Sequence, residues 1–308
     1  MGPDTLAPMN ELFEIRRATA DDSRRAFDVF LASARDLSAR QNHPWDPEPE
    51  TQWTRMRYLF DHLAAHAAEW WIAEEPATGQ AIGYARSVER GGLFELAEFF
   101  VHPGRQSAGV GGALLDRAFP IGRGEVRAII ATTDLRAQAR YYRSGCSARF
   151  PIAGMLGAPH AVAPDPGVEA VPLRPGGSDL ETVRDIEREV LEFDRGDELE
   201  WLAELREGYL YRRAGRPIGF AFLSPAGSGP IAALDEAEQP AILAHVETRA
   251  AQLGIDELGL ELPMVNEVAV RHLLDRGFRF DPFYTFLMSS RPFGQFDRYI
   301  GFSPPFVL

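Results

Sequence analysis

The sequence predicts an α/β (α+β) fold made of two similar domains, each with a mixed, mostly antiparallel sheet flanked by helices. Three observations lead to this prediction. Segments with strand and helix periodicity recur in the same order in the two halves of the 308 residues. Residues 158–167, rich in proline and glycine, are typical of a linker. The length of 308 residues is typical of about two domains, and the apolar share of 45% is ordinary for a folded protein. We therefore expect domains at 11–157 and 168–308.

The two halves begin alike, with a short strand, then a helix, then a hairpin of alternating apolar residues. The expected strands and helices of these openings are 13–19 and 21–32 in the first half, and 171–175 and 179–191 in the second. The expected hairpins pair 70–75 with 81–86, and 209–213 with 217–222.

The last strand and helix of each half give the clearest correspondence. Residues 126–131 and 257–262 have strand patterns, and each precedes a helix that ends at a glycine, Gly145 or Gly277. The hairpin glycine Gly83 lies 62 residues before Gly145, and Gly219 lies 58 residues before Gly277. This spacing indicates a tandem repeat of one α/β unit.

The composition excludes several enzyme classes. All 32 basic residues are arginine, because the chain contains no lysine. It therefore cannot form a lysine Schiff base or supply the lysine of a Walker A loop. Acid and base chemistry must come from glutamate, aspartate, histidine or tyrosine, because a guanidinium stays charged at any working pH.

The net charge of −13 is unevenly distributed. Residues 1–160 contain 18 arginines and 20 acidic residues, whereas residues 161–308 contain 14 and 25. The acidic second half disfavours a nucleic-acid partner and would suit a cationic one, although a solvated helix face explains most such charges. The single Cys146, the absence of a secretory signal and the lack of a long apolar segment predict a cytoplasmic protein without membrane contact.

One segment of the first half carries a chemical signal. A strand ending at Pro103 is followed by a glycine-containing loop and then by a helix. The first turn of a helix presents unpaired N–H groups that suit phosphate oxygens, and Gly109 and Gly111 allow close backbone approach. By themselves such glycines serve turns and packing equally well. Neither the dinucleotide-binding pattern nor the Walker pattern is present.

These residues resemble the GNAT superfamily of acyl-CoA-dependent N-acyltransferases. Its first motif is Gln or Arg, two residues, Gly, one residue, and Gly or Ala. Gln106-Ser-Ala-Gly109-Val-Gly111 meets it, directly after Val101-His-Pro103. Its later motif, Asn-x-x-Ala-x-x-x-Tyr with a following glycine, is matched by Ala137, Tyr141 and Gly145, while Asp134 replaces the asparagine. The resemblance covers the chain as a tandem, with both motifs in the first half.

The resemblance implies acetyl-CoA or another acyl-CoA as co-substrate, and no metal. The loop amides from 106 to 112 would cradle the pyrophosphate, and the backbone of 99–101 would hold the pantetheine and thioester. The implied cofactor-binding residues are Phe99, Phe100, Val101, Gln106, Ser107, Ala108, Gly109, Val110, Gly111, Gly112, Asp134 and Ala137.

Amide formation also needs an acid and a base, since the amine must lose a proton and the thiolate leaving group benefits from one. Tyr141 fits the acid, because a phenol is protonated at neutral pH. Glu98 and, second, Glu95 are the candidate bases, with His102 as a third. The two glutamates are three residues apart on one strand, so they face opposite sides unless a bulge intervenes.

The second half has lost these motifs. Acidic residues 235–238 stand where the loop glycines stood, and Leu273 occupies the tyrosine position. We expect this copy to be degenerate and non-catalytic. The resemblance implies an N-acetyltransferase for a small-molecule amine, and the acidic second half favours a cationic one. The alternative is a non-catalytic acyl-CoA-binding or sensing protein. The apolar tail from Arg291 is expected to pack across the two halves of the chain.

Overall fold

The computed structural model describes residues 13–106 and 109–304. Contacts between Cα atoms divide these residues into two compact units. The first unit takes the described residues up to 89 and those in 94–127, and the second takes 90–93 and the chain from 128 onward. The division does not coincide with the linker at 158–167. The domain boundaries therefore stay a prediction about the sequence repeat.

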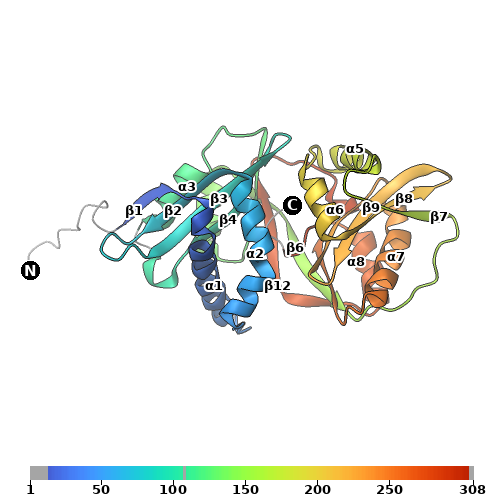
Figure 1. Ribbon diagram of the computed structural model, residues 1–308, viewed down its shortest axis with the longest axis horizontal. Helices are drawn as coiled ribbons and strands as arrows, with labels where there is room; N and C mark the ends of the chain where they lie inside the picture. Colours follow the sequence, from blue (N-terminus) through green and yellow to red (C-terminus); the bar gives the residue numbers. More distant parts are fainter. Residues whose placement is uncertain (1–12, 107–108, 305–308) are drawn as a thin grey trace, which may run out of the picture. The chain divides into compact units, whose positions relative to one another are not determined.

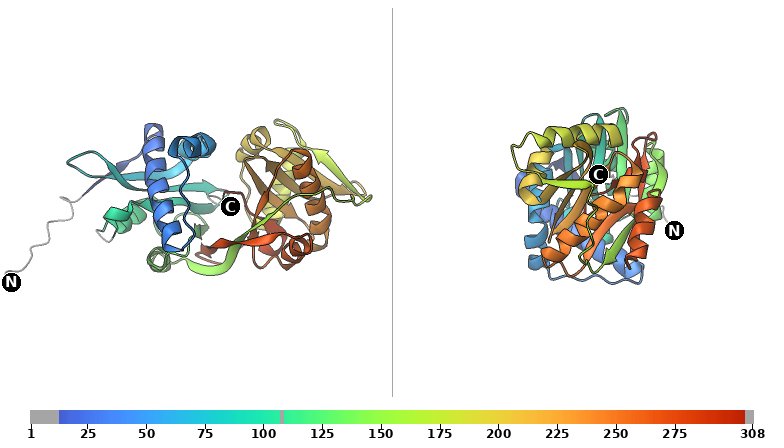
Figure 2. Two further views of the ribbon diagram at one scale, coloured as in Figure 1. Left: turned by 90° about the horizontal axis from the view of Figure 1, so that it is seen from below. Right: turned by 90° about the vertical axis from the view of Figure 1, so that its right-hand side faces the viewer.

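The first unit contains a sheet with the strand order β1-β2-β3-β4, in which β2 pairs antiparallel with β1 and β3. Helices α1 and α2 lie on one face of this sheet and α3 on the other (Figures 1 and 2). The elements of this part of the chain are β1 Glu14–Arg17, η2 Ala20–Asp22, α1 Ser23–Arg40, α2 Pro49–Ala65, β2 Ala67–Glu74, β3 Ala81–Arg90, β4 Leu93–Val101, η3 Pro103–Arg105, α3 Val110–Ala118 and the start of β5 Val126–Ala131.

Aromatic rings hold α1 and α2 to each other. Phe27 and Phe60 are both fully buried, with their ring centroids 5.6 Å apart in an edge-to-face arrangement. Trp53 of α2 lies 5.1 Å from Phe27. Such large apolar side chains dominate the burial energy of a core. They fix the pair of helices against the face of the sheet that β3 and β4 present.

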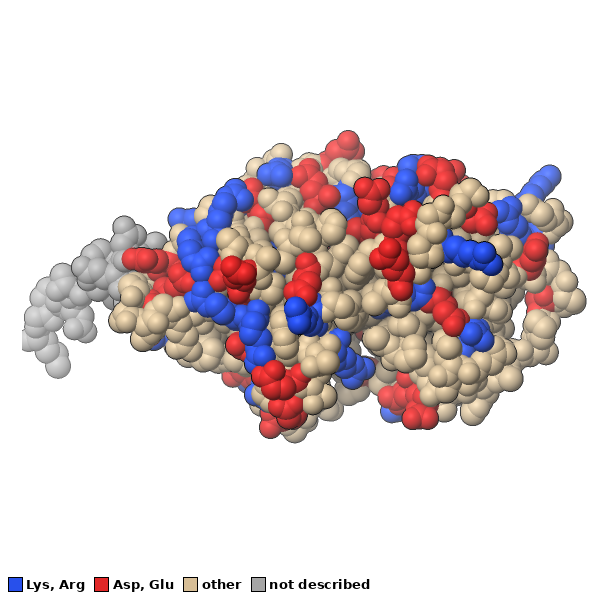
Figure 3. Space-filling model, viewed as in Figure 1, with Lys and Arg blue, Asp and Glu red and all other residues tan. Residues whose placement is uncertain are grey.

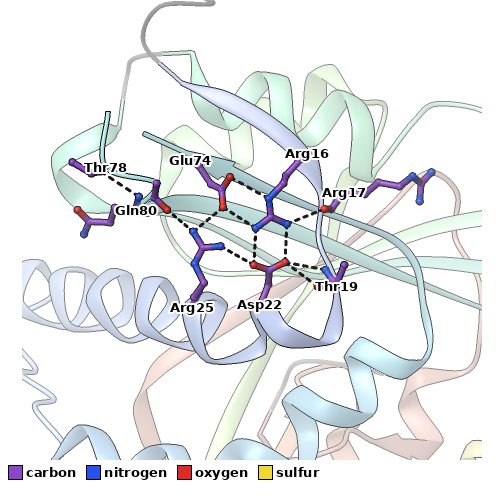
Figure 4. Close-up of polar contacts among 9 residues, drawn as sticks. Arg16, Arg17, Thr19, Asp22, Arg25, Glu74, Thr78 and Gln80 are labelled. Carbon is purple, nitrogen blue, oxygen red and sulfur yellow. Dashed lines mark hydrogen bonds and ion pairs between the residues drawn. The ribbon is translucent and has the colours of Figure 1, made fainter. Parts of the chain in front are cut away.

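A cluster of ion pairs ties the start of α1 to the edge of the sheet (Figure 4). Arg16 of β1 contacts Asp22 at 2.8 Å and Glu74 of β2 at 2.7 Å, and Arg25 of α1 contacts the same two carboxylates. Burial of Asp22 would raise its pKa, but hydrogen bonds from Arg16, Thr19 and Arg25 outweigh burial and lower that pKa to about 2. The cluster is structural and uses all of its charges internally.

The second unit contains a five-stranded sheet with the order β13-β10-β9-β8-β7 and a run of strands with the order β5-β12-β6-β11. Helices α5 and α6 cover one face of the five-stranded sheet, and α7 and α8 cover the other (Figures 1 and 2). The elements are β6 Ser147–Gly157, β7 Val168–Pro172, β8 Glu207–Arg213, β9 Arg216–Ser224, β10 Gly227–Ala233, β11 Leu258–Pro263, β12 Arg279–Ser289, β13 Tyr299–Ile300, η4 Glu236–Glu238, η5 Phe296–Arg298, α4 Leu135–Arg143, α5 Asp179–Leu191, α6 Glu198–Leu205, α7 Gln239–Gln252 and α8 Glu267–Asp275.

The two halves of the sequence exchange strands in this unit. Strand β6, which precedes the linker, pairs with β11 and β12, which both follow it. Strand β12 also pairs with β5, so it lies between two strands of the first half. Alternation explains the register, because Leu258, Leu260 and Leu262 of β11 point into the same core as Met155 of β6.

The expected fold class is confirmed. The helix predicted at 179–191 coincides with α5, and the pairs that β2, β6 and β9 make with their neighbours are antiparallel. Residues 158–165 form neither helix nor strand. They run along α7, where the His160 N–H donates to Glu247 and the Val162 N–H donates to Thr248.

Candidate active site

The end of β4 forms one side of the candidate site in the first unit. Its last three residues, Phe99, Phe100 and Val101, are only partly buried. The Val101 carbonyl accepts from the Ser33 hydroxyl and from the Gln106 side-chain amide, both at 3.2 Å. Gln106 therefore folds back onto the strand, and the structure brings this predicted residue to the strand end that the sequence pattern associated with it.

Helix α3 begins at the predicted loop. Gly109 is its N-cap with φ of +86°, a left-handed conformation that favours glycine, and it has no side chain to cap the helix. The Ala113 N–H makes the first bond of the helix to the Gly109 carbonyl, so the N–H groups of Val110, Gly111 and Gly112 precede it. This helix end is suited to anion binding. Two further predicted residues, Ser107 and Ala108, lie outside the described residues.

A glycine on β3 lets α3 approach the sheet closely. A Cβ on Gly83 would lie 3.1 to 3.3 Å from the side chains of Val110 and Leu114 and from the Phe100 carbonyl. The bare backbone of β3 thus allows the end of β4 and the start of α3 to lie beside it.

Glu98 is a buried partner of two residues of β3. It accepts from the Tyr84 hydroxyl at 2.8 Å and from the Arg86 Nε at 2.5 Å, and it also pairs with Arg86 Nη2. The side chains of Glu98 and Arg86 are fully buried. Arg86 Nη1 also donates to the Phe60 carbonyl of α2. Burial, and then the charge of Glu98, raises the pKa of Tyr84 well above its usual value.

Glu95 and Glu98 lie on the same face of β4. Phe94 stacks on Phe119, which directly follows α3, at 5.7 Å, so Phe94 points to the α3 face and Glu95 to the opposite one. Glu98 points to that opposite face as well, through its bonds to Arg86. Two residues three apart share a face only where one extra residue interrupts the alternation, which indicates a bulge. Both glutamates are buried.

Tyr84 and Arg86 are site residues that the sequence analysis missed. The available signal was an arginine in the otherwise apolar run Ile82-Gly-Tyr-Ala-Arg86, at a position that alternation assigns to the core. A charge buried there needs a partner of opposite sign. The pattern alone does not say which of the nearby carboxylates supplies it.

The residues of the later motif lie on α4, in the second unit. Asp134 is the N-cap of this helix, and its carboxylate accepts from the backbone N–H groups of Arg136 and Ala137. Burial of Asp134 would raise its pKa, but the Arg136 guanidinium and the two backbone bonds outweigh burial and lower it to about 2. Asp134 is therefore an ionised helix cap.

Tyr141 is buried near the end of the same helix, with 5% of its surface exposed. Burial, and then the negative charge of Asp134, raises the pKa of its phenol well above the usual value near 10. The phenol is therefore protonated throughout the physiological pH range. Helix α4 is followed by Gly145, whose φ of +83° is incompatible with a continued helix. The Cys146 N–H caps the helix end by donating to the Tyr141 carbonyl.

Other candidate features stay secondary. The ring of His102 accepts from the Gly104 N–H at 3.3 Å and so caps the short helix η3. Among the described residues, no group of three or more histidine, cysteine or acidic side chains is placed to hold a metal ion. Within the same part of the chain, no helix has both the length and the apolar character needed to cross a bilayer.

Sequence comparison identifies the first half. Residues 31–146 match the model of the acetyltransferase (GNAT) family. This segment belongs to the GNAT family. The matched residues include β4, the Gln106 loop, α3 and all of α4, so both motifs lie within them. No curated protein matches the chain.

Solved structures share the fold of nearly the whole chain. A candidate acetyltransferase from Pyrococcus horikoshii has a TM-score of 0.72 at 16% identity and covers 97% of this chain and 96% of its own. A GCN5-related N-acetyltransferase from Sphaerobacter thermophilus has a TM-score of 0.60 at 16% identity, with coverages of 94% and 98%. A tandem GNAT protein from the clavulanic acid biosynthesis pathway has 0.55 at 15%, with 91% and 99%. These likenesses support a tandem of two GNAT-like domains.

The match of residues 31–146 to the GNAT family implies acyl transfer from acyl-CoA. The sequence contains no lysine, so no side-chain ε-amine of this chain can form a covalent acyl intermediate. The chemistry has to be direct or pass through another nucleophile.

Proposed function

We propose that this protein transfers an acetyl or other acyl group from acyl-CoA to an amine acceptor by direct attack. The amine nitrogen forms a bond to the thioester carbonyl carbon, the carbon–sulfur bond breaks, the amine loses a proton and the departing thiolate takes one. The observation that carries the proposal is the uncapped start of α3 at Gly109, placed beside the end of β4 by the bare backbone of Gly83. Amides at such a helix end suit the pyrophosphate of CoA.

Each predicted cofactor residue has a role in this proposal. The N–H groups from Gln106 to Gly112 bind phosphate oxygens, and the backbone of Phe99–Val101 binds the pantetheine. Asp134 and Ala137 are proposed to contact the cofactor from the start of α4. The carboxylate of Asp134 accepts hydrogen bonds but cannot donate them while ionised, so it serves a donor group of the cofactor.

Tyr141 is proposed as the general acid. Its raised pKa keeps the proton on the phenol until a thiolate forms. Substitution of a general acid typically costs 10²- to 10⁴-fold in rate. We expect Tyr141→Phe to lower kcat by about 100-fold or more while the KM for acetyl-CoA changes by less than about threefold.

A glutamate on β4 is proposed as the base, either directly or through a water. Glu98 is paired with Arg86, and each of its oxygens already accepts at least one hydrogen bond. Proton transfer to Glu98 would weaken that pair, and Glu95 is the second candidate. A comparison of Glu95→Gln with Glu98→Gln in the pH profile of kcat/KM separates them, because loss of the base removes the acidic limb.

A small-molecule amine is the proposed acceptor, and the acidic second half favours a cationic one. Figure 3 shows acidic side chains gathered over α5 and α6. Several of these carboxylates pair with arginines of α5, for example Glu181 with Arg184 and Asp185 with Arg188, which leaves a partly balanced surface. Faster turnover of neutral than of cationic amines would remove this preference.

The test is release of free CoA thiol from acetyl-CoA across a panel of amines that includes aminoglycosides. Tyr142→Phe is the matched control, because Tyr142 is the neighbouring phenol and is 54% exposed. We expect turnover by the wild type and by Tyr142→Phe, and its near loss in Tyr141→Phe. CoA binding without turnover of any acceptor would favour the acyl-CoA-sensing alternative. An unchanged kcat in Tyr141→Phe would remove this residue from the mechanism.

A further inference from the structure

The C-terminal segment, residues 295–303, lies between two strands of the second unit. On one side β13 pairs with β10, with Ile300 opposite Ile231 and Tyr299 opposite Ala232. On the other side Gly301 forms a bridge to Glu261 of β11, and its N–H donates to the Glu261 carbonyl at 2.9 Å. The chain's own end therefore occupies the space between the fourth and fifth strands of the second copy.

Hydrogen bonds fix the equivalence between the two copies. The His102 N–H donates to the Ile82 carbonyl at 2.9 Å in the first copy, and the Leu234 N–H donates to the Ile218 carbonyl at 2.8 Å in the second. A glycine follows each isoleucine. A Cβ on Gly83 would press on the Phe100 carbonyl, and a Cβ on Gly219 would press on the Ala232 carbonyl. By this equivalence, Phe99 and Phe100 correspond to Ile231 and Ala232.

The residues that pair with the C-terminal segment are thus the counterparts of those proposed to hold the pantetheine, and this step rests on the proposed function. In the second copy, the backbone at these positions pairs with the segment itself, Ile231 with Ile300 and Ala232 with Tyr299. A peptide strand and a pantetheine arm make the same kind of contact, since both present amides to a strand edge.

Two side chains at the counterpart of the cofactor site also bind this segment. Asn266 is the N-cap of α8, as Asp134 is of α4. Its amide donates to the Tyr299 carbonyl at 3.3 Å and to the Gln239 side chain at 2.6 Å. Gln239, the first residue of α7, donates in turn to the Asp297 carbonyl at 2.9 Å. All three contacts lie in the interior, because Asn266 and Gln239 are buried.

The segment is anchored as firmly as a core strand. Tyr299 is fully buried, and its hydroxyl lies 2.5 Å from the Arg195 guanidinium, which is itself buried against Glu187. Arg206 donates to the Ser303 carbonyl at 2.6 Å and lies over the ring of Phe302. These charge-assisted bonds are stronger than neutral ones and hold the middle of the segment and its C-terminal end.

Two glycines of β10 are adapted to this occupant. A Cβ on Gly229 would overlap the Gly301 carbonyl, and a Cβ on Gly227 would overlap the Ser303 carbonyl. Both glycines also have positive φ angles. The strand therefore carries bare backbone where the C-terminal segment crosses it, which a strand that waits for a diffusible ligand would not require.

The start of α7 adds an electrostatic obstacle. Glu236 and Glu238 precede this helix, and Glu238 pairs with Arg213 at 2.7 Å. The first turn of α3 contains no acidic residue. A pyrophosphate at α7 would meet like charge where α3 offers only N–H groups.

We propose that residues 295–303 are a built-in occupant of the second copy's cofactor groove, so that each chain binds one acyl-CoA, through the first copy alone. The segment replaces the ligand's contacts with its own backbone and leaves the second copy folded without a cofactor.

Calorimetric titration of the full chain with CoA tests the stoichiometry. We expect one CoA per chain in the wild type and none in Gly112→Glu, which places a carboxylate in the first turn of α3 at a position that tolerates helix formers. A circular dichroism melt of that variant checks its fold. Two molecules of CoA per chain, or one that persists in the folded variant, would overturn the inference and leave the proposed function standing. No binding by the wild type would overturn both.

Hydrogen exchange of the full chain supplies an independent readout. We expect the amides of Gly301 and Ser303 to exchange slowly, and at the same rate, with and without saturating CoA. The amides of 109–113 should gain protection when CoA binds. Faster exchange in 295–303 on addition of CoA would mean that the ligand displaces the segment, and the inference would then be wrong.

Discussion

At the scale of single residues, Glu98 is both a candidate base and the partner of a buried arginine. The sequence marks it as a base because it is a carboxylate on the strand that precedes the phosphate loop. The structure shows it bonded to Arg86 and Tyr84 in the interior. Removing one partner of a buried ion pair leaves the other charge uncompensated, which typically costs about 3 to 5 kcal/mol.

We therefore predict that Glu98→Gln lowers the free energy of unfolding by about 3 kcal/mol, because Arg86 keeps its charge without a counterion. Urea denaturation followed by circular dichroism measures it. Glu89→Gln is the control, since Glu89 makes an exposed pair with Arg123 on the same hairpin and should cost less than about 1 kcal/mol. Equal losses in the two variants would contradict a structural role for Glu98.

The positions of the two glutamates could be read from the sequence, but their shared face could not. Strict alternation places Glu95 and Glu98 on opposite sides of β4. Their shared face follows from the contacts of Phe94 with Phe119 and of Glu98 with Arg86, which join residues that are not neighbours in the sequence. Tyr84 and Arg86 were missed for the same reason, because the choice of partner for a buried charge depends on tertiary packing.

At the scale of elements, the helices that follow the fifth strand of each copy begin with different caps. Asp134 caps α4 through two backbone N–H groups and is partly exposed. Asn266 caps α8 through the Ala269 N–H, and its amide also donates twice inside the core. The same position thus needs only an acceptor in the first copy, but both a donor and an acceptor in the second.

We predict that exchanging aspartate and asparagine changes the free energy of unfolding little at Asp134 and much more at Asn266. Asp134→Asn should change the free energy of unfolding by a few tenths of a kcal/mol, because asparagine caps as well as aspartate, and Asp134→Ala should cost about 1 kcal/mol. Asn266→Asp should cost more, about 2 to 4 kcal/mol, since it removes two donors and buries a charge. Thermal and urea melts of the three variants test the order. Equal effects of the two exchanges would contradict the different roles.

Local patterns predicted most elements of both copies, including α5 and the hairpins, since periodicity and glycine positions act within a short stretch of chain. They could not predict that β12 would lie between β5 and β6. Strand β12 spans Arg279–Ser289, and its neighbours β5 and β6 lie far before it in the chain, so no local pattern specifies this pairing. The tail was expected to pack across both halves. It does contact both, because β13 pairs with β10 and the Phe296 ring lies 4.9 Å from Phe150 of β6.

At the scale of the whole molecule, the protonation of one glutamate between the exchanged strands makes the free energy of unfolding depend on pH. Glu261 of β11 lies opposite Gly154 of β6 in the register, and Asp281 of β12 packs against that same glycine. Burial, and then the negative charge of Asp281, raises the pKa of Glu261 to about 7, from 4.5 for an unperturbed glutamate. The carboxyl group of Glu261 is therefore partly buried among these three strands, where its neutral form is favoured.

The sign of the effect follows from proton binding. Between pH of about 4.5 and 7 the folded state holds a proton on Glu261 that the unfolded state has lost, so the free energy of unfolding falls as the pH rises. The full shift corresponds to at most roughly 3 kcal/mol, reduced by the partial exposure of the side chain. Asp22 and Asp134, with pKa values lowered to about 2, act in the opposite direction but only below a pH of about 4.

We therefore predict that Glu261→Gln is more stable than the wild type at pH 8, by about 1 to 3 kcal/mol, and equal to it near pH 4. The glutamine keeps the shape of the neutral carboxyl and cannot ionise. Its free energy of unfolding therefore exceeds that of the wild type only at pH values where the partly buried Glu261 would be ionised. Urea denaturation at pH 4, 6 and 8 measures the difference, with Glu257→Gln as the control, because Glu257 makes an exposed pair with Arg279 and should show no such trend. A difference that stays constant across this range would mean that Glu261 does not titrate between the exchanged strands.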